Sequence, residues 1–446
     1  MENFFERMST LLSESELEAF KKEYEKPSYV GVRVNTLKCS VKKLMSLTEV
    51  FKAEDVTPFC DQGFYLRNKD VLSGNHPLHH AGAVYFQEPS AMSAATLLAP
   101  EKGDKVLDLC AAPGGKSTQL AAALDGTGLI WSNEIVKSRA NILLGNFERV
   151  GIKNGVVSNA DPESLCTQLE GYFDKVLVDA PCSGEGMIRR DPKALEEWSV
   201  EHTLSCGARQ LKILESAKKA LKPGGVLVYS TCTFSREENE GVIEAFIADN
   251  PDFELMDAGE KFGRKTLNGK AIRIYPMDGG EGHFAAKLKK KENACGFINT
   301  SAVLPTPDKK VPALVWDFLS DVFYDITSYK KLFVKDDRVY ALPEICPDLQ
   351  GTHALRAGVF VGNIKKNYFE PAHSLFTTAE IKNIRRVLDL KLTDPRVQKF
   401  LKGEEISVDN DVKGYTAVCV EGITLGFGKA SGGQLKNKYP KGLRIL

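Results

Sequence analysis

The sequence predicts an α/β fold, in which a doubly wound, mostly parallel sheet lies between a small N-terminal α+β domain and a C-terminal α+β extension. Three observations indicate this. Apolar runs alternate with helix-like segments between residues 105 and 248, which is typical of strands joined by crossover helices. A glycine-rich loop at 110–116 follows the first apolar run, as in open sheets that bind a ligand at their carboxyl edge. The chain of 446 residues is also too long for one ordinary core.

Residues 76–290 are predicted to form the sheet domain. Its strands are expected at 105–109, 129–132, 155–158, 173–178 and 226–230. Its helices are expected at 115–124, 135–150, 206–221 and 236–248. Two more short strands are expected within 272–288, one on each side of Pro276-Met277-Asp278-Gly279-Gly280. This alternation places helices on both faces of the sheet.

The N-terminal segment, residues 1–75, is predicted to form a small α+β appendage. Apolar residues between 4 and 26 have helical spacing. The segments 29–35 and 63–66 have the alternation of strands.

The basic stretch Lys287–Lys291 is followed by Pro305 and Pro312, which predicts a linker at 291–312. Residues 313–446 are then expected to form one or two small α+β domains. Their apolar clusters lie at 315–323, 354–361 and 415–427. The last of these is followed by a basic end with no acidic residue after Glu421, made of Lys429, Lys436, Lys438, Lys441 and Arg444.

Composition narrows the class of protein. A hydrophobic fraction of 43% and a charged fraction of 26% are those of a globular protein. A formal net charge of +0 argues against a simple polycation that coats nucleic acid, while leaving room for a local basic face. No run approaches the ~18 uncharged apolar residues of a membrane span, and the N-terminus lacks the pattern of a signal peptide, so we expect a cytoplasmic protein without a membrane partner.

The ten cysteines are scattered, and none forms a C-x-x-C pair. A zinc site built from neighbouring cysteines and a disulfide framework are therefore not expected, and we predict no metal. Small, inert core residues are the expectation for most of them, namely Cys39, Cys60, Cys166, Cys206, Cys295, Cys346 and Cys419.

The glycine-rich loop fits one of three nucleotide loops. A Walker loop needs a glycine where Cys110 stands, although Gly115-Lys116-Ser117 matches its end. The dinucleotide fingerprint is absent. A loop that wraps a nucleoside with a sulfonium tail predicts an acid at each of the next two strand ends, one for the ribose hydroxyls and one for the adenine edge. Glu134 and Asp161 stand at these positions.

Two cysteines also end predicted strands. Asp179-Ala180-Pro181-Cys182-Ser183-Gly184 follows one apolar run, and Ser230-Thr231-Cys232-Thr233 follows the next. Both thiols are therefore expected at the ligand-binding edge of the sheet. A partly ionised, accessible thiol is a nucleophile, which indicates covalent chemistry beside a bound cofactor. On the residues alone, either cysteine is a candidate nucleophile.

These segments resemble the RNA cytosine-5 methyltransferases of the Sun (Fmu) family. Three of its signatures stand in order here: Asp-x-Cys-Ala-Ala-Pro-Gly-Gly-Lys from Asp108, Asp-Ala-Pro-Cys-Ser-Gly from Asp179 and Ser-Thr-Cys-Thr from Ser230. The resemblance covers roughly residues 28–290, and includes Arg33-Val34-Asn35 upstream and His283-Phe284 downstream. It implies a Rossmann-like fold that binds S-adenosylmethionine.

The chain is also similar to one branch of that family, the bacterial 16S rRNA enzymes whose C-terminal extension ends in a PUA-like module. The glycine- and lysine-rich segment 426–442 carries this second resemblance.

The resemblance implies roles for individual residues. Cys232 is expected to attack the base, and Cys182 to assist release of the methylated RNA. Asp179 is expected to contact both the methionine amino group and the cytosine ring, with Lys116 adding positive charge. The cofactor is expected to contact Cys110, Ala111, Ala112, Pro113, Gly114, Gly115, Lys116, Glu134, Asp161 and Asp179.

The predicted function is methyl transfer to carbon 5 of cytidine in ribosomal RNA, through a covalent cysteine–RNA intermediate. The expected partner is ribosomal RNA or the small ribosomal subunit, bound by a monomer through its N-terminal appendage and C-terminal extension. Two alternatives remain, a tRNA cytosine-5 methyltransferase and an rRNA-binding assembly factor without catalytic turnover. The intact loop, acids and thiols disfavour the second, and a P-loop NTPase is more distant still.

Overall fold

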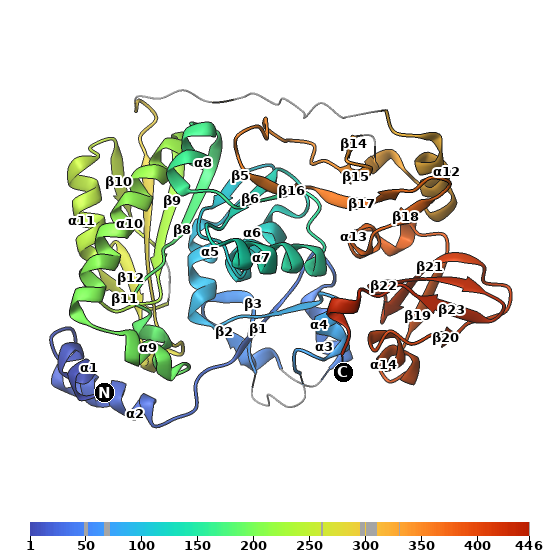
Figure 1. Ribbon diagram of the computed structural model, residues 1–446. Helices are drawn as coiled ribbons and strands as arrows, with labels where there is room; N and C mark the ends of the chain where they lie inside the picture. The colour runs from blue at the N-terminus through green and yellow to red at the C-terminus, as the bar shows by residue number, and fades with distance from the viewer. Residues whose placement is uncertain are drawn as a thin grey trace.

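The computed structural model describes residues 1–48, 52–66, 72–259, 262–294, 299, 310–329 and 331–445. Within these residues the chain forms four sheets, of which one has ten strands and occupies the centre of the molecule (Figure 1). The N-terminal sheet and the two C-terminal sheets lie around it. Cys295 and most of the predicted linker lie outside the described residues.

The central sheet confirms the doubly wound prediction. Its parallel strands are β5 (Lys105–Asp108), β6 (Leu129–Asn133), β7 (Gly155–Ser158), β8 (Phe173–Asp179) and β9 (Leu221–Thr231). They lie in the order β7-β6-β5-β8-β9, so that the direction of winding reverses at β5. Antiparallel strands extend the sheet beyond β9, namely β13 (His283–Lys290), β12 (Ala271–Ile274), β11 (Arg264–Thr266) and β10 (Phe253–Met256).

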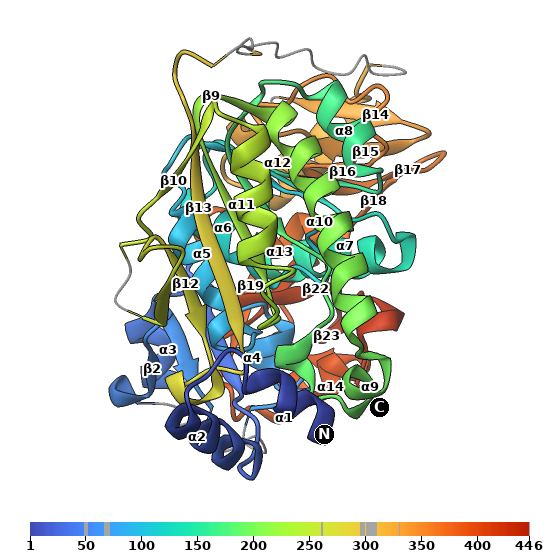
Figure 2. The ribbon, with the colours of Figure 1, turned by 90° about the vertical axis from the view of Figure 1, so that its left-hand side faces the viewer.

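Helices cover both faces of this sheet. One core lies under α8 (Pro162–Gln168), α10 (Val200–Ala220) and α11 (Glu240–Asp249), and the other under α5 (Ser93–Leu98), α6 (Gly115–Leu124) and α7 (Lys137–Val150). Figure 2 shows α10 and α11 in front of the sheet. Strand β8 serves both cores, because Val176 and Val178 belong to the first and Leu177 to the second. This alternation is the period of two expected for a strand.

Several predicted boundaries are wrong. Helix α11, expected at 236–248, begins at Glu240, and β9, expected at 226–230, begins at Leu221. Helix α10 was expected at 206–221 but begins at Val200, where the Ser199 hydroxyl accepts a hydrogen bond from His202 N (3.0 Å) and caps its first turn. The stretch with helical spacing at 4–26 forms two helices, α1 (Glu2–Met8) and α2 (Glu14–Tyr24). Glu16 accepts a hydrogen bond from Ser13 N (2.9 Å), and this capping contact starts the second helix.

The N-terminal sheet is antiparallel, in the order β2-β3-β1-β4. Its strands are β1 (Gly31–Val34), β2 (Val56–Thr57), β3 (Cys60–Tyr65) and β4 (Val84–Phe86), with α3 (Val41–Leu47) and α4 (Pro77–His80) between them. Strand β4 lies beyond the predicted boundary at residue 75, so this sheet is completed only at residue 86.

The C-terminal part contains two further sheets. The first consists of β14 (Leu332–Lys335), β15 (Arg338–Ala341), β17 (Val359–Ile364) and β18 (Phe369–Pro371), with α12 (Ala313–Val322) and α13 (His373–Thr377). The second consists of β19 (Val387–Leu390), β20 (Ile406–Ser407), β21 (Gly414–Val420), β22 (Ile423–Ser431) and β23 (Gln434–Asn437), with α14 (Pro395–Leu401). A short helix, α9 (Pro192–Glu197), precedes α10 in the central domain.

One C-terminal strand belongs to the central sheet. Strand β16 (Ala354–Ala357) pairs antiparallel with β7, and Arg356 forms an ion pair with Glu148 of α7. The apolar cluster at 354–361 was expected to lie inside the C-terminal extension, but the structure divides it between two sheets. Strand β16 therefore covers the edge that β7 would otherwise expose.

The last sheet also contacts the N-terminal domain. Leu390, Val397 and Phe400 share a core with residues of α3, β1 and β3. The ring of His80 on α4 lies 2.8 Å, Nδ1 to Oη, from Tyr439. The N- and C-terminal parts are thus packed against each other beside the central sheet (Figure 1).

Two features of the described residues bear on the predictions from composition. None of the helices that the structure describes is long and apolar enough to cross a membrane. In the same described part, no three His, Cys, Asp or Glu side chains are grouped so as to hold a metal ion.

A chain that ends at residue 310 is expected to be less stable than the full chain, because it leaves the edge of β7 unpaired and Glu148 without Arg356. Its thermal unfolding temperature should fall, and size-exclusion chromatography should show aggregation. A chain that ends at residue 384 keeps β16 and is the matched control. Equal unfolding temperatures for the two truncated chains would contradict this role of β16.

Stability is also expected to fall as pH decreases below about 6.5, partly because of His283 on β13. Its side chain is 1% exposed, and burial with the nearby Lys116 cation lowers its pKa to about 3. The unfolded chain, in which histidine has a pKa of about 6.5, then binds a proton that the folded chain does not. This stabilisation is present above pH 6.5 and is lost as pH falls toward 3.

The measurement is the urea midpoint as a function of pH, in the wild type and in His283→Gln. The substitution should reduce the slope of unfolding free energy by about 1.4 kcal/mol per pH unit, the effect of one proton, between roughly pH 6 and pH 4. His202→Gln, at an exposed position, is the control. An unchanged slope in His283→Gln would show that this ring is protonated in the folded protein.

Candidate active site at the carboxyl edge of the central sheet

A cavity of about 1260 Å³ lies at the carboxyl ends of the parallel strands. It lies where the strand order reverses, beside β5 and β8, which is the usual ligand position in an open α/β sheet. Its wall includes loop residues that follow every one of the five parallel strands. Among them are Leu109, Cys110, Ala112, Glu134, Ile135, Val136, Asp161, Asp179, Ala180, Pro181, Cys182 and Cys232.

The glycine-rich loop contributes to this wall with only part of its length. Cys110 and Ala112 line the cavity, whereas Ala111, Pro113, Gly114, Gly115 and Lys116 are not among its lining residues. Gly114 has a left-handed φ of +114° and caps α6, and a Cβ added there would lie 3.0 Å from the side chain of Leu143. The glycines therefore shape the turn between β5 and α6.

Glu134 and Asp161 both line the cavity, but Glu134 is buried and Asp161 is exposed. Glu134 is 3% exposed; it accepts a hydrogen bond from Val136 N (2.9 Å) and lies 3.3 Å from Arg139. Asp161 is exposed and caps α8, where its Oδ1 accepts hydrogen bonds from two backbone amides of the first turn, Glu163 N and Ser164 N. The structure thus brings the two acids to one cavity, and gives Asp161 a structural role that the sequence analysis missed.

Asp179 lies at the centre of a partly buried charged group. Lys116 Nζ is 2.8 Å from Asp179 Oδ2, and the Ser230 hydroxyl donates to Asp179 Oδ1 (2.8 Å). Nε2 of His283 lies 3.8 Å from the same Oδ1. Lysines at the start of a helix are usually solvated, but here the first turn of α6 faces the end of β8, so Lys116 and Asp179 form an ion pair.

The pKa values of this group follow from its surroundings. Burial raises the pKa of Asp179, but the charge of Lys116 and the hydrogen bonds from Lys116 and Ser230 outweigh it and lower the pKa overall. Burial lowers the pKa of Lys116, and Asp179 reverses this, so the lysine keeps its proton. Asp108, one strand away, has a pKa raised to about 7 by burial. Asp179 is therefore the ionised carboxylate of the pair.

The two cysteines predicted at the sheet edge are in contact. Strands β8 and β9 are parallel neighbours in which Asp179 lies opposite Ser230, so the loops after them run side by side. The sulfur atoms of Cys182 and Cys232 lie 3.3 Å apart, and both residues line the cavity. The contact with Cys232 and burial raise the pKa of Cys182 well above its usual value, so Cys182 stays a thiol.

The other cysteines that the structure describes have no such arrangement. Burial raises the pKa of Cys110 well above its usual value, and this thiol stays protonated. Those expected to be inert core residues and described by the structure are free and buried, namely Cys39, Cys60, Cys166, Cys206, Cys346 and Cys419.

The N-terminal sheet contacts the end of the glycine-rich loop and the start of α6 through hydrogen bonds from Arg33. Arg33 of β1 is 2% exposed and donates to Gly115 O (3.1 Å) and to Thr118 Oγ1 (2.6 Å) of α6. Its Nε donates to Gln87 Oε1 (3.1 Å). Burial lowers the pKa of Arg33 to about 10. Within the described residues, the buried guanidinium of Arg33 bonds only neutral groups. These bonds join the N-terminal sheet to the central domain at the glycine-rich loop.

Several residues of the site were not identified as such from the sequence. Ser230 and His283 were noted only as parts of motifs, and their contacts with Asp179 depend on strand pairing. Glu185 and Glu238, described below, stand in segments that resemble ordinary charged helix starts. No local signal distinguishes them from surface glutamates.

Four family models match the chain in order. Residues 1–89 match the N-terminal domain of 16S rRNA methyltransferase RsmF, and residues 95–289 match 16S rRNA methyltransferase RsmB/F. Residues 317–378 match the first C-terminal domain of RsmF rRNA methyltransferase, and residues 387–445 match the methyltransferase RsmF PUA domain.

Curated relatives match over nearly the whole length. The ribosomal RNA small subunit methyltransferase F of Vibrio vulnificus is 33% identical over 459 residues, which covers 99% of this chain and 97% of the relative. The protein of the same name from Aliivibrio salmonicida is 32% identical, with 97% and 95% covered.

Solved structures agree with these matches. A methyltransferase homologue from Pyrococcus horikoshii is 33% identical, with a TM-score of 0.54 over 63% of this chain and 92% of that chain. NSun6 from the same organism, solved with SFG, is 25% identical, with a TM-score of 0.56 over 64% of this chain and 97% of that chain. The chain therefore belongs to the ribosomal RNA small subunit methyltransferase F family, and S-adenosylmethionine is its cofactor.

Proposed function

We propose that the protein transfers a methyl group from S-adenosylmethionine to carbon 5 of a cytidine in 16S ribosomal RNA, through a covalent bond to Cys232. The observation that carries the proposal is the contact between two thiols, 3.3 Å apart, at one cavity beside an ionised aspartate. Methyl transfer to an oxygen or nitrogen atom needs neither thiol, whereas carbon 5 of cytosine requires a nucleophile to activate the ring.

The cavity residues fit the cofactor. Ile135 and Val136 offer apolar surface for an adenine ring, with Asp161 at its edge and Glu134 placed for the ribose hydroxyls. Asp179 is an ionised acceptor for the methionine ammonium group. The cofactor supplies an electrophilic methyl group on a sulfonium.

Cys232 begins the reaction on the base. Its thiolate bonds to carbon 6 of cytosine, and the electron pair of the C5–C6 double bond makes carbon 5 nucleophilic. After carbon 5 has gained the methyl group it loses its proton to a base. The C5–C6 double bond then re-forms and Cys232 leaves as a thiolate.

Asp179 and Lys116 have different roles toward the negative charge that this addition creates in the ring. Because Asp179 is ionised, its carboxylate accepts hydrogen bonds and is not the source of a proton. Lys116 Nζ, held 2.8 Å from Asp179, is the cation that stabilises the negative charge developing in the ring.

Cys182 assists the last step. Its raised pKa keeps the sulfur protonated, and it lies against Cys232. A thiol in this position donates a hydrogen bond to the departing sulfur, which favours breakage of the bond to carbon 6. The pair thus has one nucleophile and one donor.

The comparisons favour ribosomal RNA over the alternatives. The full-length relatives carry names that refer to the small-subunit rRNA, and the last module matches the RsmF PUA domain. A tRNA substrate is the second candidate, and bisulfite sequencing of rRNA and tRNA from a deletion strain separates the two. Loss of 5-methylcytidine from tRNA alone would reject the rRNA assignment. The cytoplasmic location and the monomeric state stay predictions.

Asp161→Ala is expected to weaken S-adenosylmethionine binding by about 0.5–1.5 kcal/mol, the usual net contribution of one hydrogen bond, because Asp161 is exposed. It also removes the cap of α8, whereas Asp161→Asn keeps a capping side chain with an acceptor oxygen and loses only the charge. Calorimetric titration with S-adenosylmethionine gives the affinity.

Asp394→Ala is the matched control, since Asp394 caps α14 away from the cavity. It should lower the unfolding temperature and leave the affinity unchanged. Unaltered binding in both Asp161 variants would remove this residue from the cofactor site.

The two thiols are expected to give opposite phenotypes. Cys232→Ala should abolish both methylation and the covalent RNA adduct, because no nucleophile remains. Cys182→Ala should still add to the base and transfer the methyl group, and then retain the RNA. A slow-migrating band on a denaturing gel with unmodified RNA reports the adduct.

A stable adduct in Cys232→Ala, with none in Cys182→Ala, would reverse the assigned roles. Full methylation by both variants without any adduct would reject covalent catalysis by these residues. Cys166→Ala, a core cysteine on α8, serves as the control.

A further inference from the structure

Two buried glutamates connect the loops that carry the catalytic thiols. Glu185 follows Cys182 in its loop, and Glu238 follows Cys232. Both side chains are 0% exposed, and neither is among the residues that line the cavity. Each carboxylate bonds to the loop of the other cysteine.

Glu185 holds the residues that follow Cys232. Its carboxylate accepts hydrogen bonds from Thr233 Oγ1 (2.7 Å), Phe234 N (2.7 Å), Ser235 Oγ (3.0 Å) and Trp198 Nε1 (2.9 Å). Three of these four donors lie directly after Cys232. The fourth, on Trp198, fixes the glutamate from the segment between α9 and α10.

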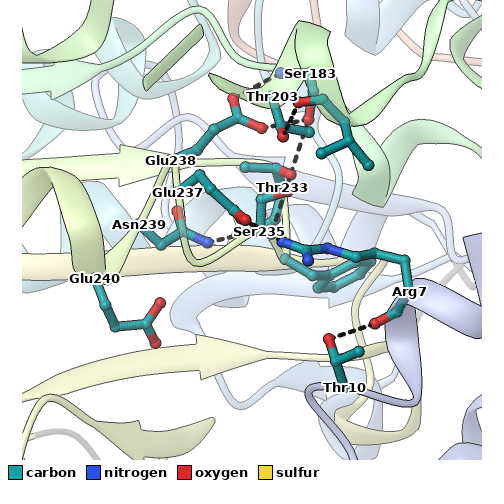
Figure 3. Close-up of polar contacts among 12 residues, drawn as sticks. Arg7, Thr10, Ser183, Thr203, Thr233, Ser235, Glu237, Glu238, Asn239 and Glu240 are labelled. Atoms are coloured by element: carbon teal, nitrogen blue, oxygen red, sulfur yellow. Dashed lines mark hydrogen bonds and ion pairs between the residues drawn. The ribbon is translucent and has the colours of Figure 1, made fainter. Parts of the chain in front are cut away.

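Glu238 holds the residue that follows Cys182. Its carboxylate accepts hydrogen bonds from Ser183 N (2.9 Å), from the Ser183 hydroxyl and from Gln210 Nε2 (2.9 Å) of α10. In Figure 3 the carboxylate of Glu238 points toward Ser183, whereas that of Glu237 lies beside Arg7. Adjacent glutamates therefore have different partners.

The two loops also touch directly. The hydroxyl oxygens of Ser183 and Thr233 lie 3.0 Å apart, and Gly186 N donates to Cys232 O (2.9 Å). The residue after each cysteine is therefore fixed twice, once by the neighbouring loop and once by a glutamate.

Burial of these two glutamates costs free energy. A buried carboxylate loses its hydration, and among the described residues neither Glu185 nor Glu238 forms an ion pair with a lysine or arginine. The hydrogen-bond donors to the two carboxyl groups given above are all neutral. Well-packed apolar side chains in such places are often as stable as buried charges, so stability by itself does not account for two of them.

We propose that Glu185 and Glu238 are positioning residues that form a reciprocal clamp, holding the sulfur atoms of Cys182 and Cys232 in contact. Each glutamate acts through the backbone and hydroxyl groups next to a cysteine. The inference deepens the proposed function, on which the roles of the thiols rest. The contact between the sulfurs is a property of the folded chain and is testable without RNA.

The test measures how fast the two thiols form a disulfide in the full-length protein. Diamide, a diazene oxidant, takes two electrons and two protons from the thiols and becomes a hydrazine, while the S–S bond forms. Mass spectrometry of the tryptic peptides after quenching with a thiol-alkylating reagent gives the rate. Cys182→Ser, which cannot form this bond, defines the background.

Glu185→Gln and Glu238→Gln are expected to slow disulfide formation about 10- to 100-fold, because displacement by about 1 Å costs a proximity-dependent reaction roughly this much. The kcat for methylation should fall by a similar factor. The Kd for S-adenosylmethionine should stay within about twofold, because neither glutamate lines the cavity.

Glu237→Gln is the matched control, one residue from Glu238 and bonded to Arg7 instead, and should leave the disulfide rate unchanged. If a glutamate variant does not fold, Thr233→Val and Ser183→Ala remove single donors to the clamp and are expected to slow the reaction less. Circular dichroism melting establishes folding in each case.

A disulfide rate equal to that of the wild type in folded Glu185→Gln and Glu238→Gln, or in both donor variants, would overturn the clamp. If these variants form the disulfide slowly but Cys232→Ala methylates RNA normally, the proposed function is overturned and the clamp is not. The two failures are thereby distinguishable.

Discussion

The parallel register of β8 and β9 is the constraint on which the candidate site depends. It sets Asp179 opposite Ser230, so that the serine hydroxyl reaches the aspartate and the loops after both strands leave the sheet side by side. A shift of one residue would turn every side chain to the other face of the sheet. The thiols would then no longer meet, because their positions follow from the same register.

Charge at this edge is set by burial and by charged partners together. Asp108 and Asp179 end neighbouring strands, yet burial raises the pKa of the first to about 7, whereas Lys116 lowers that of the second. The site therefore has one ionised carboxylate, Asp179, beside a lysine, Lys116, that keeps its proton. The same principle governs the thiols, since the contact with Cys232 keeps Cys182 protonated.

The flanking domains are joined to the catalytic sheet by specific contacts. Strand β16, from the C-terminal part, completes the edge of β7, and Arg33 of the N-terminal sheet bonds the start of α6. An RNA bound by either flanking domain would thus meet a cavity whose position relative to that domain is determined. This coupling explains why a catalytic sheet separated from residues beyond 310 is not expected to behave as an independent unit.

Local patterns in the sequence determined the architecture of the central domain. The apolar run Val176-Leu177-Val178 contributes alternately to two cores, as strands do, and Gly114 marks the left-handed turn before α6. The placement of both cysteines at strand ends followed from this alternation. Such features depend on neighbours a few residues away, so they are visible in the sequence.

Only the tertiary structure decided which distant groups meet. The ion pair of Lys116 with Asp179, the pairing of β16 with β7, and the bonds of Glu185 and Glu238 to the opposite loops all join residues far apart in the chain. A glutamate near a helix start has the same local pattern whether it is solvated or buried. Its partners, and hence its role, are set by the packing of β8 against β9 and of α10 against both, which no local pattern encodes.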